Sequence, residues 1–364
     1  MSQRVAVLGT GLIGTSIALA ARQGFGALVV GYDPDSSALE GAQRRGALQP
    51  AGSLEEAAGD ADLVFVCPPV SQIPHVAAAA LRAGSGPVTD VGSAKMEVLR
   101  RLDGLLAGDE GLGSRFVGGH PMTGSERSGP EAASSTLLDG AIWVLTPTKE
   151  TDGHAVRSIE EAVNAMGGQP IRLDPERHDR MVALTSHLPQ LASSALMRTA
   201  TEEAVAEPEL LMLSAGGFRD LTRLAASNPA LWVDILEANR EALGSALELF
   251  ARRLEELAAL VANGDTAALT EALEAAKRSR LELAAKPTAK LGVAIFGVPI
   301  PDRPGALAEI TALLSAQRVN IEDLEIVHSA EGARGTVHLT VAVESADATA
   351  KALEERGYRV ALIA

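Results

Sequence analysis

The 364-residue sequence contains one cysteine, few aromatic residues and fewer basic than acidic side chains. Cys67 has no second cysteine to pair with and no companion ligands at metal-binding spacing, so we expect neither a disulfide nor a metal site. A formal net charge of −15 disfavours binding to nucleic acid or to an anionic membrane. No apolar run approaches the ~18 residues that a membrane helix needs. We therefore expect the partner to be a small molecule.

The N-terminal residues run directly into a glycine-rich loop and leave no room for a signal peptide with its cleavage site. On this ground we expect a cytoplasmic protein. The length predicts two or three domains, since one domain takes about 150 residues.

The glycine-rich loop has the surroundings of a dinucleotide-binding site. Residues 4–8 are apolar or β-branched, as in a buried parallel strand, and the glycines lead into a helical run. The next apolar strand ends at Asp33, ~20 residues past the loop, where an acidic side chain binds a ribose 2′-hydroxyl. No arginine or lysine follows Asp33 to neutralise a 2′-phosphate, which favours NAD over NADP. The residues expected to bind NAD are Gly9, Gly11, Leu12, Ile13, Gly14, Asp33 and Pro68.

Three segments differ in their periodicity. Apolar strands alternate with alanine-rich helices as far as Asp174, which predicts an α/β Rossmann-type doubly wound sheet over residues 1–174. Residues 175–285 carry almost no strand signal and predict an all-α domain. Residues 291–364 have a βαββαβ pattern, which predicts a ferredoxin-like unit.

A long helix is predicted within the all-α domain. It begins at Asn228 and Pro229, and nothing in the sequence stops it before Asn263 and Gly264. Its apolar side chains recur at spacings of three and four residues, as they do along a contact with a partner helix. This seam is either part of the intrachain core or, as the helix length favours, a homodimer interface. The seam consists of Leu243, Leu247, Phe250, Leu254, Leu257 and Val261.

The segment "GGHPMTGSERSG", residues 118–129, places His120 after an expected strand of the sheet. Ligands of open α/β sheets bind beyond the carboxyl ends of the strands, so His120 is expected to face the nicotinamide and to exchange a proton. Ser125 and Glu126 follow as further polar groups. Ser93, in "DVGSAK", either caps a helix or orients His120.

The all-α domain holds further polar candidates. Pro189 should kink the helix that contains it and expose Ser186 and Gln190, one turn apart on one face. His178 and His187 are expected to be solvated or packed. Arg223 either holds a carboxylate bidentately or belongs to a surface ion pair.

These segments together resemble one family. "GLIGTS", "DVGSAK", "GGHPMTGSERSG", "SHLPQ" and "GFRDLTRLAASNPALW", in this order, are similar to the prephenate and arogenate dehydrogenases of tyrosine biosynthesis. The resemblance implies an NAD-dependent oxidative decarboxylation of a cyclohexadienol. It further implies that His120 accepts a hydrogen bond from the C4 hydroxyl, that Ser93 orients His120, and that Arg223 holds a substrate carboxylate. Other residues at positions of the family's substrate pocket are Ser125, Glu126, Ser186, Gln190 and Trp232.

The sequence departs from the family at Gln190, where many members that use prephenate have a histidine. A glutamine forms hydrogen bonds but supplies no positive charge near an anionic substrate, which leaves the choice between prephenate and arogenate open. Prephenate is the expected substrate, and arogenate is the alternative. A hydroxyacid dehydrogenase of the phosphoglycerate type is disfavoured because the glycine loop already begins at Gly9. A non-catalytic sensor of NAD and amino acids is disfavoured by the intact His120 segment.

The C-terminal unit, with "PDRPGALAEITALLSAQRVNIEDLEI", resembles an ACT domain. In that resemblance Asp302, Pro304 and Gly305 form the turn into the first helix, and Asn320 and Ile321 open the second strand. Helix N-termini of this kind bind carboxylates, and tyrosine is the expected effector. The alternative is a domain that only dimerises.

Overall fold

The computed structural model describes residues 3–123, 127–284, 293–301, 303–328 and 334–363. By its contacts the chain divides into two compact units. One comprises residues 1–194 and 224–249, and the other comprises residues 195–223 and 250–364. None of the helices in these described ranges combines the length and apolar character that a bilayer span requires.

The first unit contains an eight-stranded sheet in the order β3-β2-β1-β4-β5-β6-β7-β8. Its strands are β1 (Arg4–Leu8), β2 (Leu28–Tyr32), β3 (Gln49–Pro50), β4 (Leu63–Val66), β5 (Val88–Asp90), β6 (Phe116–Pro121), β7 (Ile142–Thr146) and β8 (Gln169–Arg172). Neighbouring strands are parallel except for β6 and β7, which pair antiparallel. The predicted Rossmann-type sheet is confirmed, and its last two strands run opposite to the others.

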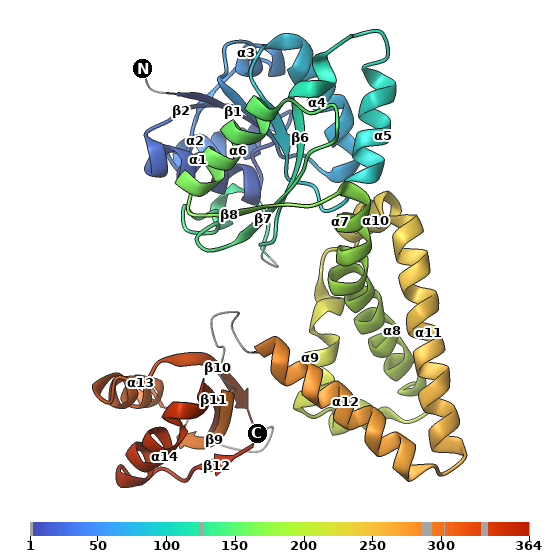
Figure 1. Ribbon diagram of the computed structural model, residues 1–364, viewed down its shortest axis with the longest axis vertical. Helices are drawn as coiled ribbons and strands as arrows, with labels where there is room; N and C mark the ends of the chain where they lie inside the picture. The colour runs from blue at the N-terminus through green and yellow to red at the C-terminus, as the bar shows by residue number, and fades with distance from the viewer. Residues whose placement is uncertain (1–2, 124–126, 285–292, 302, 329–333, 364) are drawn as a thin grey trace. The chain divides into compact units, whose positions relative to one another are not determined.

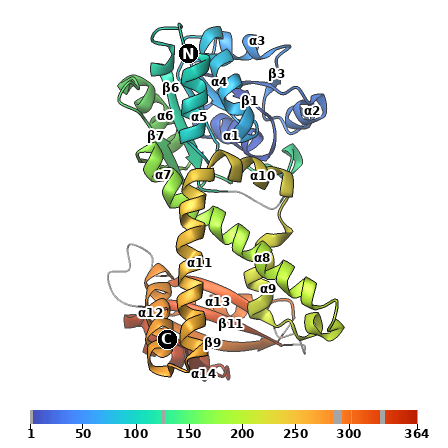
Figure 2. The same ribbon diagram turned by 90° about the vertical axis from the view of Figure 1, so that its right-hand side faces the viewer.

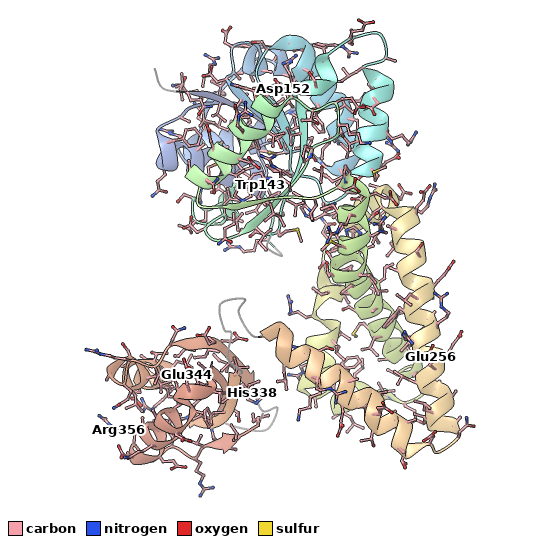
Figure 3. All side chains as sticks on the ribbon, viewed as in Figure 1. Trp143, Asp152, Glu256, His338, Glu344 and Arg356 are labelled. Atoms are coloured by element: carbon pink, nitrogen blue, oxygen red, sulfur yellow. The ribbon has the colours of Figure 1, made fainter. Side chains whose placement is uncertain are left out.

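Helices cover both faces of this sheet (Figure 1). One face packs against α1 (Leu12–Phe25), α2 (Ser36–Arg44) and α6 (Gly153–Ala165), and its core includes Trp143. Figure 3 shows Trp143 on β7 and Asp152 at the start of α6, where the Asp152 carboxylate accepts the His154 N–H and caps the helix. The other face packs against α3 (Leu54–Gly59), α4 (Ile73–Ala83) and α5 (Met96–Leu105).

The chain reverses its direction of winding between β1 and β4, and Gly9 lies at this switch point. Gly9 has a positive φ of 99°, and a Cβ built on it would lie 2.7 Å from the carbonyl carbon of Cys67. Only glycine allows the loop after β1 to approach the Cys67–Pro68 backbone this closely. Dinucleotides bind at such a switch point, so the loop lies where the sequence predicts a cofactor.

The helical part of the first unit begins with α7 (Pro175–Val182), a π-helical turn (Ala183–His187) and the first residues of α8 (Leu188–Glu203). The sequence predicted a kink at Pro189. The structure instead has the π-helical turn just before it, and Pro189 is the second residue of α8. The Leu188 N–H donates to the Ala183 carbonyl oxygen in this wider turn, and a π-helical turn of this kind accommodates a proline, which has no N–H to donate.

The prediction of one helix from Asn228 to Asn263 is wrong. The structure has α10 (Pro229–Ala238) and α11 (Arg240–Ala262), with Asn239 between them outside helical geometry. Figure 2 shows the change of direction between the two helices. The Asn239 side chain is buried and donates to the Asp179 carbonyl oxygen at 2.9 Å. This tertiary hydrogen bond holds Asn239 at the break, whereas the local sequence favours a continuous helix.

The second unit includes α9 (Gly216–Thr222), α12 (Thr266–Ala284) and a four-stranded antiparallel sheet in the order β10-β11-β9-β12. Its elements are β9 (Val293–Pro301), α13 (Ala306–Ala316), β10 (Ile321–His328), β11 (Arg334–Ala342), α14 (Ala346–Glu355) and β12 (Ala361–Leu362). The predicted βαββαβ unit is confirmed, with both helices packed into one core with the sheet (Figure 1). The three domain ranges 1–174, 175–285 and 291–364 stay a prediction.

Candidate active site

His120 is the penultimate residue of β6 rather than part of a loop after the strand, as the sequence predicted. The strand is longer than expected because antiparallel pairing with β7 continues to its end, and His120 lies opposite Val144. The histidine therefore sits at the carboxyl end of a central strand, on rigid backbone.

A buried ion pair holds the backbone just before His120. The Lys95 ammonium contacts Asp90 Oδ2, and both side chains are fully buried. Lys95 Nζ also donates to the Gly119 carbonyl oxygen at 2.7 Å, and Asp90 Oδ1 accepts the Gly119 N–H at 2.9 Å. A Cβ on Gly119 would lie 2.4 Å from the Asp90 carbonyl oxygen, so this position requires glycine. A Cβ on Gly118 would lie 2.4 Å from Thr146 Oγ1 and 3.1 Å from Lys95 Cδ, so both glycines before His120 allow close packing around β6.

The side chain of His120 belongs to a chain of buried polar groups from α7. His120 Nδ1 lies 2.9 Å from His178 Nε2, and His178 Nδ1 lies 2.8 Å from Asp179 Oδ1. Asp179 also accepts the backbone N–H groups of Lys95 and Met96, each at 2.8 Å, at the start of α5. His178 is neither solvated nor packed only against apolar groups, because it connects His120 to a carboxylate.

Burial lowers the pKa of His120 well below its usual value of 6.5, and repulsion between a protonated His120 and a positive charge on His178, Lys95 or His187 lowers it further. His120 is therefore neutral at physiological pH. A neutral imidazole has one nitrogen that carries a proton and one that accepts a proton, so His120 can serve as a proton acceptor.

His187, on the π-helical turn, lies beside the same network. Its Nδ1 is 3.1 Å from Nδ2 of Asn239, and its ring packs edge-on against Trp232 with centroids 6.2 Å apart. Burial lowers the pKa of His187 from 6.5 to about 4. Within the described part of the chain, its buried Nε2 has no hydrogen-bond partner.

Gln190 and Ser93 carry further buried polar atoms. Gln190 Nε2 donates to the Leu224 carbonyl oxygen at 2.9 Å, while its buried Oε1 has no partner among the described residues. The buried hydroxyl of Ser93 is likewise without a partner in those residues, so it makes no hydrogen bond to His120 in this structure. Ser186 is half-buried on the π-helical turn. The roles predicted for Ser93, Ser186 and Gln190 stay predictions.

Three residues of the predicted substrate site lie outside the network around His120 that is described above. Ser125 and Glu126 lie outside the described residues. Arg223 precedes Leu224 in the chain and belongs to the second compact unit. Its predicted contact with a carboxylate stays a prediction.

The glycine loop has the features of a phosphate-binding turn. Gly11 is the N-cap of α1 and no side chain caps this helix, so the N–H groups of its first turn, including those of Leu12 and Ile13, are available to an anion. The space at Gly11, where a Cβ would point, is open. The Asp33 carboxylate accepts the Thr10 N–H at 2.6 Å and the Asp35 N–H at 2.9 Å, which fixes it beside the loop. These residues fit a dinucleotide.

The family of the chain is decided by comparison with known proteins. Family models match residues 17–172 as "Prephenate dehydrogenase, nucleotide-binding domain", residues 174–275 as "Prephenate dehydrogenase, dimerization domain" and residues 297–357 as an ACT domain. A prephenate dehydrogenase of Bacillus subtilis is 31% identical over 347 residues, which cover 93% of this chain and 92% of the relative. The chain belongs to the prephenate dehydrogenase family.

Other relatives show the range of the family. A cyclohexadienyl dehydrogenase of Zymomonas mobilis is 32% identical and matches 77% of this chain and 96% of its own. Prephenate dehydrogenase from Aquifex aeolicus, solved with hydroxyphenyl propionate and NAD+, is 32% identical with a TM-score of 0.72, covering 78% of this chain and 99% of that chain. Synechocystis arogenate dehydrogenase is 28% identical with a TM-score of 0.67, covering 76% and 99%.

The ACT domain of this prephenate dehydrogenase family member has a cavity of its own. The cavity has a volume of about 230 Å³ and includes Pro304 and Gly305 in its lining, together with Arg303 and Ile326. Gly305 has a positive φ of 91° and is the N-cap residue of α13. Asp302 lies outside the described residues, and Asn320 directly precedes β10, which begins at Ile321.

The sequence analysis missed most of the residues that hold His120 in place. Asp90 and Lys95 were present in "DVGSAK", but their contact with Gly119 depends on the pairing of β5 with β6. The pair of glycines before His120 was the available signal for a close approach. His178 and Asp179 had no local signal, because their contacts are with β6 and α5.

Proposed function

We propose that this protein is an NAD-dependent prephenate dehydrogenase that converts prephenate into 4-hydroxyphenylpyruvate and CO2. The observation that carries the proposal is His120, a neutral and half-buried histidine at the carboxyl end of β6 in a nucleotide-binding fold. Membership of the family and the NAD+ bound to the Aquifex relative support the same activity.

NAD would be held by the glycine loop and the start of α1, with Gly9, Gly11, Leu12, Ile13 and Gly14 near its pyrophosphate. Asp33 would bind the ribose 2′-hydroxyl, and Pro68 would line the site on the β4 side. The bound cofactor supplies a hydride acceptor.

The chain's own residues handle the proton and the carboxylates. As the hydride leaves C4 of the substrate, the C4 hydroxyl becomes acidic and passes its proton to His120. The bond to the ring carboxylate then breaks, CO2 leaves, and its electron pair completes the aromatic ring. The resulting phenolate takes the proton back from His120, so the histidine is restored.

Formation of the aromatic ring drives these reaction steps, so the site needs only a proton acceptor and a cation that binds a substrate carboxylate. In the proposal Ser93 orients His120 when substrate is bound, and Arg223 holds a substrate carboxylate. The remaining pocket residues are Ser125, Glu126, Ser186, Gln190 and Trp232.

Arogenate is the second candidate substrate, and the hydrogen bonding of the Gln190 side chain favours it. The amide nitrogen of Gln190 is engaged by Leu224, which leaves the buried Oε1 as its available group. A carbonyl oxygen attracts an ammonium group, as in the side chain of arogenate, more than the keto acid of prephenate. The Synechocystis relative is itself an arogenate dehydrogenase.

The test is NADH formation by the purified protein with prephenate and with arogenate, compared by kcat/KM. A higher value with prephenate supports the first candidate, and a higher value with arogenate supports the second. Binding of NADH without turnover of either substrate would contradict both and favour a sensor.

We further propose a cytoplasmic homodimer that is regulated by tyrosine. The exposed side chains of Leu247, Phe250, Leu254 and Val261 on α11 supply an apolar surface for a second copy. Tyrosine would bind the ACT domain and inhibit the enzyme. Loss of this inhibition in a Gly305→Val variant would support the proposal. A monomer in light scattering would contradict the dimer, and equal activity with and without tyrosine would contradict the effector.

A further inference from the structure

With both imidazole rings neutral, the hydrogen bonds from Asp179 to His120 have only one consistent set of directions. An ionised carboxylate accepts and never donates, so the 2.8 Å contact requires a proton on His178 Nδ1. A neutral His178 then has a lone pair on Nε2. The 2.9 Å contact between the two rings requires one donor, which must be His120 Nδ1.

Backbone N–H groups at the start of α5 hold Asp179 as a hydrogen-bond acceptor. Its carboxylate is almost fully buried, yet it accepts the N–H groups of Lys95 and Met96 at the positive end of α5. Each of its two carboxylate oxygens thus already accepts one backbone N–H. Asp179 therefore stays an acceptor, and the directions along the chain follow from it.

We propose that Asp179 and His178 are positioning residues that fix the tautomer of His120, with its proton on Nδ1 and its lone pair on Nε2. A neutral histidine without such a partner carries its proton on either nitrogen. With the proton on Nε2, His120 could not accept a proton there from the substrate hydroxyl. The catalytic consequence rests on the proposed function, but the tautomer itself does not.

The geometry indicates that His178 also orients the His120 ring, in addition to fixing which nitrogen carries the proton. The two rings are nearly perpendicular, at 77°, with centroids 5.1 Å apart, so the His178 nitrogen lies near the edge of the His120 ring. His178 is 1% exposed, so water does not compete for this contact. When His120 takes up a proton, the cation is stabilised through His178 by the Asp179 carboxylate.

The tautomer is measured directly on the full-length protein by nitrogen-15 NMR of histidine side chains, above the usual histidine pKa of about 6.5. The sequence has seven histidines, and the His120→Asn and His178→Gln variants assign the two resonances of interest. We expect both rings to be neutral and protonated on Nδ1. A His120 protonated on Nε2, or on both nitrogens, would overturn the proposal. This result does not depend on which substrate the enzyme uses.

Two amide variants of His178 test the catalytic consequence. In His178→Gln the carbonyl oxygen reaches the place of Nε2 and can accept from His120, whereas in His178→Asn the amide reaches only the place of Nδ1. We expect the Asn variant to lose about 10- to 100-fold in kcat with little change in KM. The Gln variant should keep most of the activity, because it restores the acceptor.

Equal losses in the two variants, or no loss in either, would refute the positioning role. If the Asn variant does not fold, the NMR result on the wild type still decides the tautomer. A wild-type enzyme that is inactive with both substrates would instead contradict the proposed function and leave the tautomer measurement valid.

Discussion

Replacing Lys95 by Met should destabilise the nucleotide-binding domain strongly. The methionine side chain ends one atom short of the ammonium and matches the apolar stem of lysine, so the change removes mainly the charge and its hydrogen bonds. Asp90 is then left fully buried without a counter-ion, and the Gly119 carbonyl oxygen loses its donor.

The size of the effect follows from burial. Removing one partner of a buried ion pair costs about 3–5 kcal/mol, because the remaining charge is uncompensated. Arg100 supplies a matched control on α5, since its contact with Glu97 at 2.8 Å is on the surface and its side chain is 70% exposed. Exposed pairs of this kind contribute at most about 1 kcal/mol, so Arg100→Met should have little effect.

Urea unfolding, followed by the fluorescence of Trp143, measures the change in stability of the nucleotide-binding domain. The protein has two tryptophans, so a Trp232→Phe background leaves Trp143, buried in β7, as the probe. The double variant Lys95→Met with Asp90→Asn should be more stable than the single Lys95 variant, because no buried charge is left unpaired. If Lys95→Met and Arg100→Met unfold at the same urea concentration, the reasoning about the buried pair is refuted.

Three further predictions concern the cofactor, the substrate and pH. Asp33→Ser should weaken the preference for NAD over NADP, measured by kcat/KM for each cofactor, and an unchanged preference would show that Asp33 does not face the ribose. Arg223→Lys should mainly raise KM, since a point charge replaces a bidentate fork, and an unaltered KM would argue against its contact with a carboxylate. Burial lowers the pKa of His187 from 6.5 to about 4, so the unfolded state binds a proton between these pH values while the folded state does not. Stability should therefore fall as the pH is lowered from about 6.5 to about 4, by up to ~3 kcal/mol. The His187→Gln variant should show a shallower dependence over that range, and an identical slope in wild type and variant would contradict the shift.

The sequence predicted those parts of the fold that depend on local patterns. The glycine loop, the strand that ends at Asp33 and the βαββαβ unit each have a periodicity or a turn signal within one short segment. The two-residue strand β3 was missed because it is too short to show any periodicity.

Parts of the fold that depend on distant contacts were not predictable in the same way. Asn239 interrupts a helix because Asp179, 60 residues away in sequence, accepts its side-chain N–H. His120 was identifiable from its setting at a strand end, but its partner His178 is 58 residues away and carries no local motif. The sequence therefore identified the residue proposed to react with substrate, while the residues that hold it in place became visible only with the packing of α7 against β6 and α5.

The most direct test of the account is turnover of prephenate with NAD by the wild-type protein and by His120→Asn, measured side by side. The asparagine variant should fold normally, as judged by circular dichroism, and should lose about 10²- to 10⁴-fold in kcat, because it has no nitrogen that accepts the proton. Turnover of the variant near the wild-type rate would remove His120 from the mechanism and contradict the central claim.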